Sequence, residues 1–69
     1  MPYYVRWQQR GQDHVIKHDI PFPTPSEAMD FACAVLAHGP DDVWVENARG
    51  EKIALDLKIR QHCKDRGFP

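Results

Sequence analysis

The stretch TPSEAMDFACAVLAHGP, residues 24–40, constrains the fold more than any other part of the sequence. Thr24 can cap the first free amides of a helix, Pro25 suits the first turn because it lacks a donor there, and Glu27 completes a capping box. Gly39 and Pro40 end the helix. Between these signals apolar side chains recur at helical spacing, as Ala28, Phe31, Ala32, Val35 and Leu36. The sequence therefore predicts a helix of about 14 residues with one apolar side.

Four segments around this helix have the pattern of strands. Apolar and polar side chains alternate within them, which is typical of strands with one buried face: 3–8, 14–20, 42–47 and 51–55. Gly11 marks a turn between the first two, and Gly50 closes a tight turn, NARG, between the last two. The link IPFPTP is stiffened by three prolines and cannot continue a central strand. We therefore expect two hairpins, one on each side of the helix in the sequence.

The last segment, residues 56–66, has two possible interpretations. Leu55, Leu57 and Ile59 alternate as they would in a strand, whereas DLKIRQHCKDR contains helix formers, late basic groups and a following Gly67. We favour a short final helix. The element order is then β-β-α-β-β-α, an α+β fold in a single small domain over residues 1–69, whose antiparallel four-stranded sheet carries the capped helix on one face.

Strand pleating divides the side chains of this sheet between two faces. The face beneath the helix should be apolar, with Tyr3, Val5, Trp7, Ile16, Ile20, Val43, Val45, Ile53 and Leu55. His14 and His18 share that face, and His18 suits the edge of the core. The opposite face mixes aromatic rings with positive charge, from Tyr4, Arg6, Val15, Lys17, Trp44 and Lys52.

Length and charge limit the function classes. A chain of 69 residues has a thin stability margin, which disfavours a deep enclosed active site. The net charge of −1 argues against a strongly electrostatic partner, although residues 26–47 hold five acidic and no basic side chains while both ends are net basic. No apolar run could span a bilayer, and the start MPYYVRWQQ lacks the pattern of a secretion signal. We expect a cytoplasmic protein with no membrane partner.

Two cysteines are too few for a disulfide framework, and we expect free thiols at Cys33 and Cys63, although a single bridge stays open. Zinc ligation is disfavoured, because no C-x-x-C spacing exists and Cys33 and His38 point to different sides of the helix end. We expect no metal and no cofactor.

Nucleophilic catalysis has little support either. The one serine, Ser26, and the one threonine, Thr24, lie at a helix start where capping explains them. Cys63 has basic neighbours, but an incidental surface thiol is the simpler interpretation. Asp41 and Asp42 follow the helix as solvated turn residues. Catalytic residues are therefore not assigned, and we do not expect an enzyme.

Binding remains as the function class. Tyr4 and Trp44 offer two exposed rings on the sheet face opposite the helix, and Arg6, Lys17 and Lys52 add three positive charges. We predict that these five residues form a binding face for a protein partner or a second copy of the chain. Nucleic acid is the less favoured partner, because the chain is not basic overall. Alternatively, the final helix folds over this face through Leu57 and Ile59.

Residues 3–36, YYVRWQQRGQDHVIKHDIPFPTPSEAMDFACAVL, also carry a resemblance. An aromatic-valine-arginine strand, a second strand, F-x-T and a capped helix with Glu-Ala resemble the arm-type DNA-binding domains at the start of phage integrases, with matches at Tyr4, Val5, Arg6, Phe22, Thr24, Glu27 and Ala28. The resemblance implies a sheet that enters the DNA major groove, with Arg6 and Lys17 at the duplex. The second strand here has a single lysine where that family is richly basic, and residues 41–69 have no counterpart.

Overall fold

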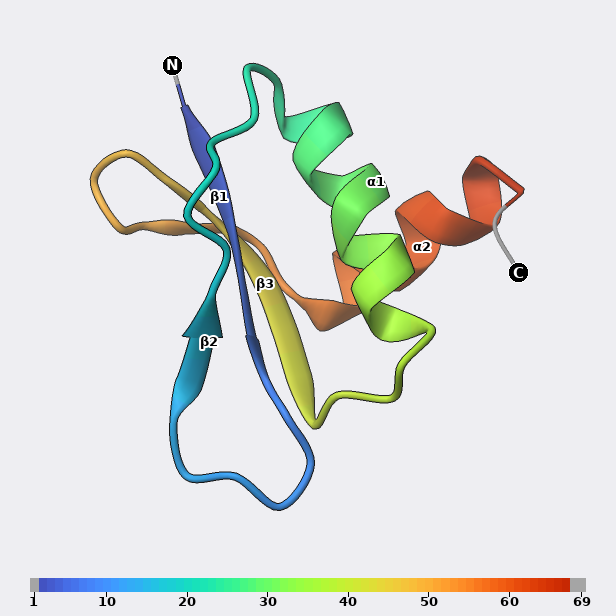
Figure 1. The fold of residues 1–69 in the computed structure, drawn as a ribbon. Helices are drawn as coiled ribbons and strands as arrows, with labels where there is room; N and C mark the ends of the chain where they lie inside the picture. The colour runs from blue at the N-terminus through green and yellow to red at the C-terminus, as the bar shows by residue number, and fades with distance from the viewer. Residues whose placement is uncertain (1, 68–69) are drawn as a thin grey trace.

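Residues 2–67 of the computed structural model are described, and they fold in the expected order β-β-α-β-β-α (Figure 1). The strands are β1 (Tyr3–Gln8), β2 (Val15–Lys17), β3 (Asp42–Asn47) and β4 (Lys52–Ala54), and the helices are α1 (Pro25–Leu36) and α2 (Asp56–Asp65). The sheet has the order β2-β1-β3-β4, and all neighbours are antiparallel. The fold class predicted from the sequence is confirmed.

The capped helix forms as its sequence predicts. Thr24 is the N-cap, and its Oγ1 accepts a hydrogen bond from the backbone N–H of Glu27 at 3.2 Å, while Pro25 occupies the first helical position. The helix covers 12 residues, slightly fewer than expected, because the chain leaves it at Ala37 and turns at Gly39, whose φ is +70°. Its buried side is made of Ala28, Ala32, Cys33 and Val35.

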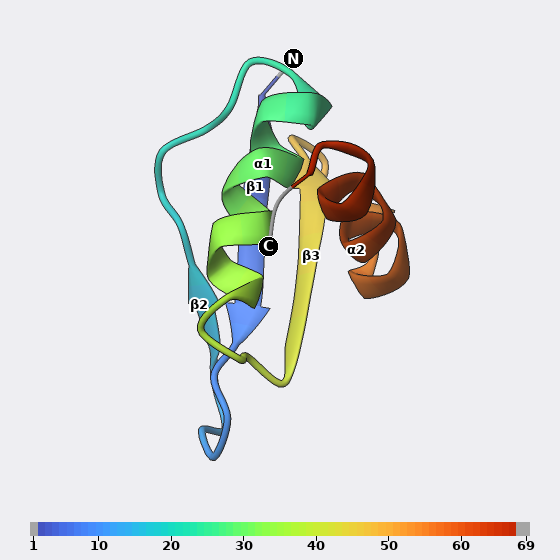
Figure 2. The same cartoon turned by 90° about the vertical axis from the view of Figure 1, so that its right-hand side faces the viewer.

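Both helices lie on the same side of the sheet, as Figure 2 shows. Val5 pairs with Val45 and Trp7 with Val43 across β1 and β3, so these side chains share one face, and the three valines are fully buried. Ile59 and Cys63 of α2 belong to the same core cluster as the buried side of α1. The alternative in which the final helix covers the opposite face is therefore wrong: α2 packs beside α1, and no helix covers the other face of the sheet among the described residues.

The second strand is shorter than predicted, and Ile20 does not reach the core. β2 ends at Lys17, and Ile20 is 67% exposed. His18 takes the place at the core edge, with its ring centroid 4.3 Å from that of Phe31 and 5.6 Å from that of Phe22. Because Ile20 precedes a proline and the ladder has already ended, its side chain turns to solvent.

An irregular register at the other edge explains a second correction. Val45 pairs with Ala54 and Glu46 with Lys52, so Ile53 is an extra residue between the two pairs. This bulge lets Lys52 lie on the face opposite the helices while Ala54, not Leu55, is buried in the core. Leu55 is 57% exposed because it is the N-cap residue of α2, where the chain has already left the sheet.

The prediction of free thiols is wrong. Cys33 of α1 and Cys63 of α2 form a disulfide, with their Cα atoms 5.7 Å apart. The physical reason is tertiary: α2 lies against α1 and brings together two residues that are 30 positions apart in the chain. Within the described range, neither helix has the length and apolar character needed to cross a membrane.

Candidate functional site

The structure brings the five residues of the predicted binding face onto the helix-free side of the sheet. Arg6 of β1 lies opposite Lys17 of β2 and opposite Trp44 of β3, so these three form a row across the strands. Tyr4 lies two residues before Arg6 and faces Glu46, which in turn faces Lys52 of β4. We call this surface the outer face. Its composition follows from pleating, because residues opposite each other in an antiparallel ladder point to the same side.

Glu46 holds the outer face together, and sequence reasoning did not single it out. Its Oε1 accepts a hydrogen bond from Trp44 Nε1 at 2.9 Å, and its Oε2 lies 3.4 Å from Arg6 Nε. The Arg6 and Glu46 side chains are only 16% and 19% exposed. The signal was present in the sequence, since a carboxylate two residues after Trp44 in a strand must share its face.

Trp44 is not the exposed ring that the sequence analysis expected. It is only 8% exposed, because Lys52 Nζ lies 4.3 Å from its ring centroid and Glu46 binds its indole N–H. Lysine stems readily cover apolar surface while the ammonium stays near solvent. The ring of Trp44 is therefore part of the protein's own packing and is not free for stacking on a partner.

Arg6 is anchored rather than free. Its guanidinium carbon lies 5.0 Å from the ring centroid of Tyr4, and its NH1 donates to the carbonyl oxygen of His18 at 3.3 Å. With the contact to Glu46, Arg6 links three neighbouring parts of the sheet. Lys17, by contrast, is exposed and forms no ion pair with the residues that the structure describes.

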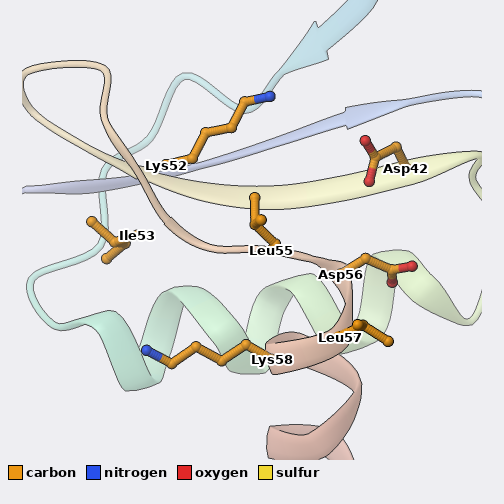
Figure 3. Close-up of a pocket in the computed structure, with 7 residues that line it drawn as sticks. All are labelled: Asp42, Lys52, Ile53, Leu55, Asp56, Leu57 and Lys58. Carbon is orange, nitrogen blue, oxygen red and sulfur yellow. The ribbon is translucent and has the colours of Figure 1, made fainter.

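A groove beside β4 was not found from the sequence. It has a volume of about 720 Å³, and two lysines, two aspartates and three aliphatic side chains line it: Asp42, Lys52, Ile53, Leu55, Asp56, Leu57 and Lys58 (Figure 3). Leu57 is 82% exposed. The available signal was helical periodicity: Ile59 is fully buried, and a residue two positions away in a helix points to nearly the opposite side.

The contact between the helices contains the remaining chemistry-bearing side chains. His62 Nε2 lies 2.7 Å from Asp30 Oδ1, and Arg66 NH2 donates to Asp30 Oδ2 at 3.3 Å, close to the disulfide. Cys63 is thus neither a surface thiol nor a nucleophile in this state. Over residues 2–67, no three His, Cys, Asp or Glu side chains come together in a way that could hold a metal ion.

Comparisons of this chain with protein-family models, with curated proteins and with solved structures gave no significant match. The resemblance of residues 3–36 to the integrase arm-type domains therefore stays a prediction.

Proposed function

We propose that this protein is a non-enzymatic binding module that holds a protein partner on the outer face of its sheet. The observation that carries the proposal is the arrangement of the layers: both helices pack on one side of the sheet (Figures 1 and 2). The other side carries Tyr4, Arg6, Lys17 and Lys52, and no helix of residues 2–67 covers it. At its β4 edge this face continues into exposed aliphatic surface at Leu55 and Leu57. The ring of Tyr4, exposed lysines and aliphatic groups on one surface suit a protein partner.

The state of the cations favours protein over nucleic acid. Arg6 is 3.4 Å from a carboxylate and Lys52 lies over Trp44, so contact with a phosphate would compete with existing interactions. The carboxylates of Glu46 and Asp42 belong to the same face and would repel a phosphate backbone. Lys17 is exposed and forms no ion pair with the residues that the structure describes. Binding of DNA, which the resemblance to integrase domains implies, is therefore the alternative, and a salt titration distinguishes it from binding of a protein.

Several groups that could act in catalysis take part in interactions within the fold. Cys33 and Cys63 are joined to each other, Thr24 caps α1, and Asp41 lies 3.8 Å from Arg10 at the surface. These assignments support a binding role rather than an enzymatic one. The expected cytoplasmic location stays a prediction, and the disulfide weighs against it because the cytosol keeps most thiols reduced.

The test compares capture of partners by two charge-reversal variants. Lys17→Glu alters the outer face, and Lys64→Glu alters an exposed lysine on α2 as its matched control. We expect the wild type and Lys64→Glu to retain the same proteins from a lysate of the source cells, and Lys17→Glu to lose them. Equal capture by both variants would contradict the proposal.

A salt titration separates the two partner classes. Nucleic-acid binding through phosphate contacts weakens steeply as salt rises, and it would be lost on Arg6→Ala. A protein complex that buries aliphatic surface depends less on salt. Retention of duplex DNA by the purified protein at low salt, lost in Arg6→Ala, would replace the protein partner with a nucleic acid.

A further inference from the structure

The groove beside β4 has a basic end and an acidic end. Figure 3 shows the ammonium of Lys58 toward one end and Asp42 and Asp56 toward the other, with Leu55 and the ammonium of Lys52 between them. The backbone of Lys52 faces Glu46, which is four residues beyond Asp42 on β3, and its side chain reaches back so that Nζ lies 4.3 Å from the ring centroid of Trp44. In α2, Asp56 and Lys58 are two residues apart and therefore leave the helix on nearly opposite sides.

The same groove carries aliphatic side chains that the folded chain does not bury. Leu57 is 82% exposed and Leu55 is 57% exposed, although the neighbouring Ile59 is fully enclosed in the core. Figure 3 places Ile53 at the basic end and Leu57 at the acidic end. Adjacent exposed leucines around a hollow are a common sign of a contact surface with another protein.

We propose that this groove joins two copies of the chain in a twofold dimer. A twofold contact uses the same patch on both subunits, so the patch must complement itself. A twofold axis that crosses the groove at Leu55 lays the basic end of one copy on the acidic end of the other. Lys58 then meets Asp56 of the other copy, and Leu57 enters the hollow beside the other copy's Ile53.

Asp42 and Asp56 can still form ion pairs with a second copy, because each uses only one carboxylate oxygen within its own chain. Asp56 Oδ1 accepts from Arg60 Nε at 2.8 Å, and Asp42 Oδ1 accepts from the N–H of Val43 at 2.9 Å. Neither Oδ2 forms a hydrogen bond with the described residues. A partner of a single charge sign would be attracted by one end of the groove and repelled by the other, whereas a second copy satisfies both ends.

Addition of a strand from another chain to β4 is the less suitable use of this edge. β4 has three residues and contains a bulge at Ile53, and short, irregular edge strands resist further pairing. The contact therefore relies on side chains rather than on a continued hydrogen-bond ladder. In naming a second copy as a partner we rest on the proposed function, in which the chain is a binding module.

Sedimentation of the purified, oxidised protein over a range of concentrations tests the dimer. We expect reversible dimerisation, and we expect Leu57→Glu to raise the dimer dissociation constant at least about tenfold. Ile20→Glu is the matched control, because Ile20 is also exposed, at 67%, but lies next to the opposite edge of the sheet. A wild type that stays monomeric up to its solubility limit overturns the proposal, as does equal weakening by both variants.

A mixing experiment identifies the pairing. In a dimer of Lys58→Glu, the new glutamate meets Asp56 of the other copy at both symmetric contacts. In a dimer of Asp56→Lys, the new lysine meets Lys58 of the other copy at both contacts. Each variant alone should therefore dimerise about tenfold more weakly than the wild type. Mixed with each other, the two variants regain opposite charges at both contacts and should form a heterodimer close to wild-type strength. Failure of the mixture to recover overturns the pairing, provided that circular dichroism shows both variants folded.

The dimer proposal and the proposed function can be refuted independently of each other. The sedimentation experiment contains only this chain, whereas the capture experiment reports on other proteins. A monomeric wild type whose partner capture depends on Lys17 would remove the dimer and leave the proposed function standing. If the wild type forms a dimer that depends on Leu57, but Lys17→Glu captures the same proteins as the wild type, the dimer stands and the proposed function is removed.

Discussion

Reduction of the disulfide between Cys33 and Cys63 should remove a large part of the free energy of unfolding. The bridge closes a loop with a sequence separation of 30 residues that contains β3 and β4. Loop-closure entropy for that length corresponds to about 3.6 kcal/mol in favour of the folded state. A domain of 69 residues has a total free energy of unfolding of roughly 3.5–10 kcal/mol. The bridge therefore supplies a third or more of the margin.

The reduced protein should lose its folded structure first at α2. Besides Cys63, the buried residue of this helix is Ile59, and its polar contact with α1 runs through Asp30 to His62 and Arg66. These interactions remain after reduction, but the bridge accounts for a third to all of the free energy of unfolding, so the urea midpoint of the reduced protein should fall sharply. Urea titrations of the oxidised and reduced protein, followed by circular dichroism, measure the difference.

A double variant separates the covalent bond from the reducing agent. Cys33→Ala with Cys63→Ala cannot form the bridge, so its unfolding curve should be the same with and without reductant. A thiol assay on the unfolded, unreduced wild type should detect no free cysteine. Two free thiols in that assay, or a loss on reduction below about 1 kcal/mol, would refute the reasoning from loop closure.

Three further substitutions test the sheet, the cap and the core. Glu46→Ala should lower the free energy of unfolding by about 1–3 kcal/mol, because Trp44 and Arg6 lose their shared acceptor while remaining largely buried, and tryptophan fluorescence should report the change. Thr24→Ala should cost about 1 kcal/mol in thermal unfolding, whereas Thr24→Ser should retain most of the cap. Ile59→Ala should cost about 2–5 kcal/mol in urea unfolding, since this side chain is fully enclosed; a cost below about 1 kcal/mol would contradict the placement of α2.

Local patterns were sufficient for the elements and for the two faces of the sheet. The N-cap at Thr24 set the start of α1, and the DVWVEN pattern matched β3 residue for residue. Alternation also placed Tyr4, Arg6 and Lys17 on the side opposite the helices. These features depend on backbone geometry within a few neighbouring residues, so the local sequence predicts them whatever the rest of the fold does.

Contacts between distant segments decided the rest. No local pattern shows that α2 lies beside α1. That placement alone brings Cys33 to Cys63, and within residues 2–67 it leaves the outer face without a helix. The low exposure of Trp44 likewise depends on Lys52 from another strand. The groove is formed by side chains of β3, of β4 and of the start of α2 together. Periodicity assigns a side chain to a face, whereas its burial, bonding and access to partners are set by whichever distant residues the tertiary packing places against it.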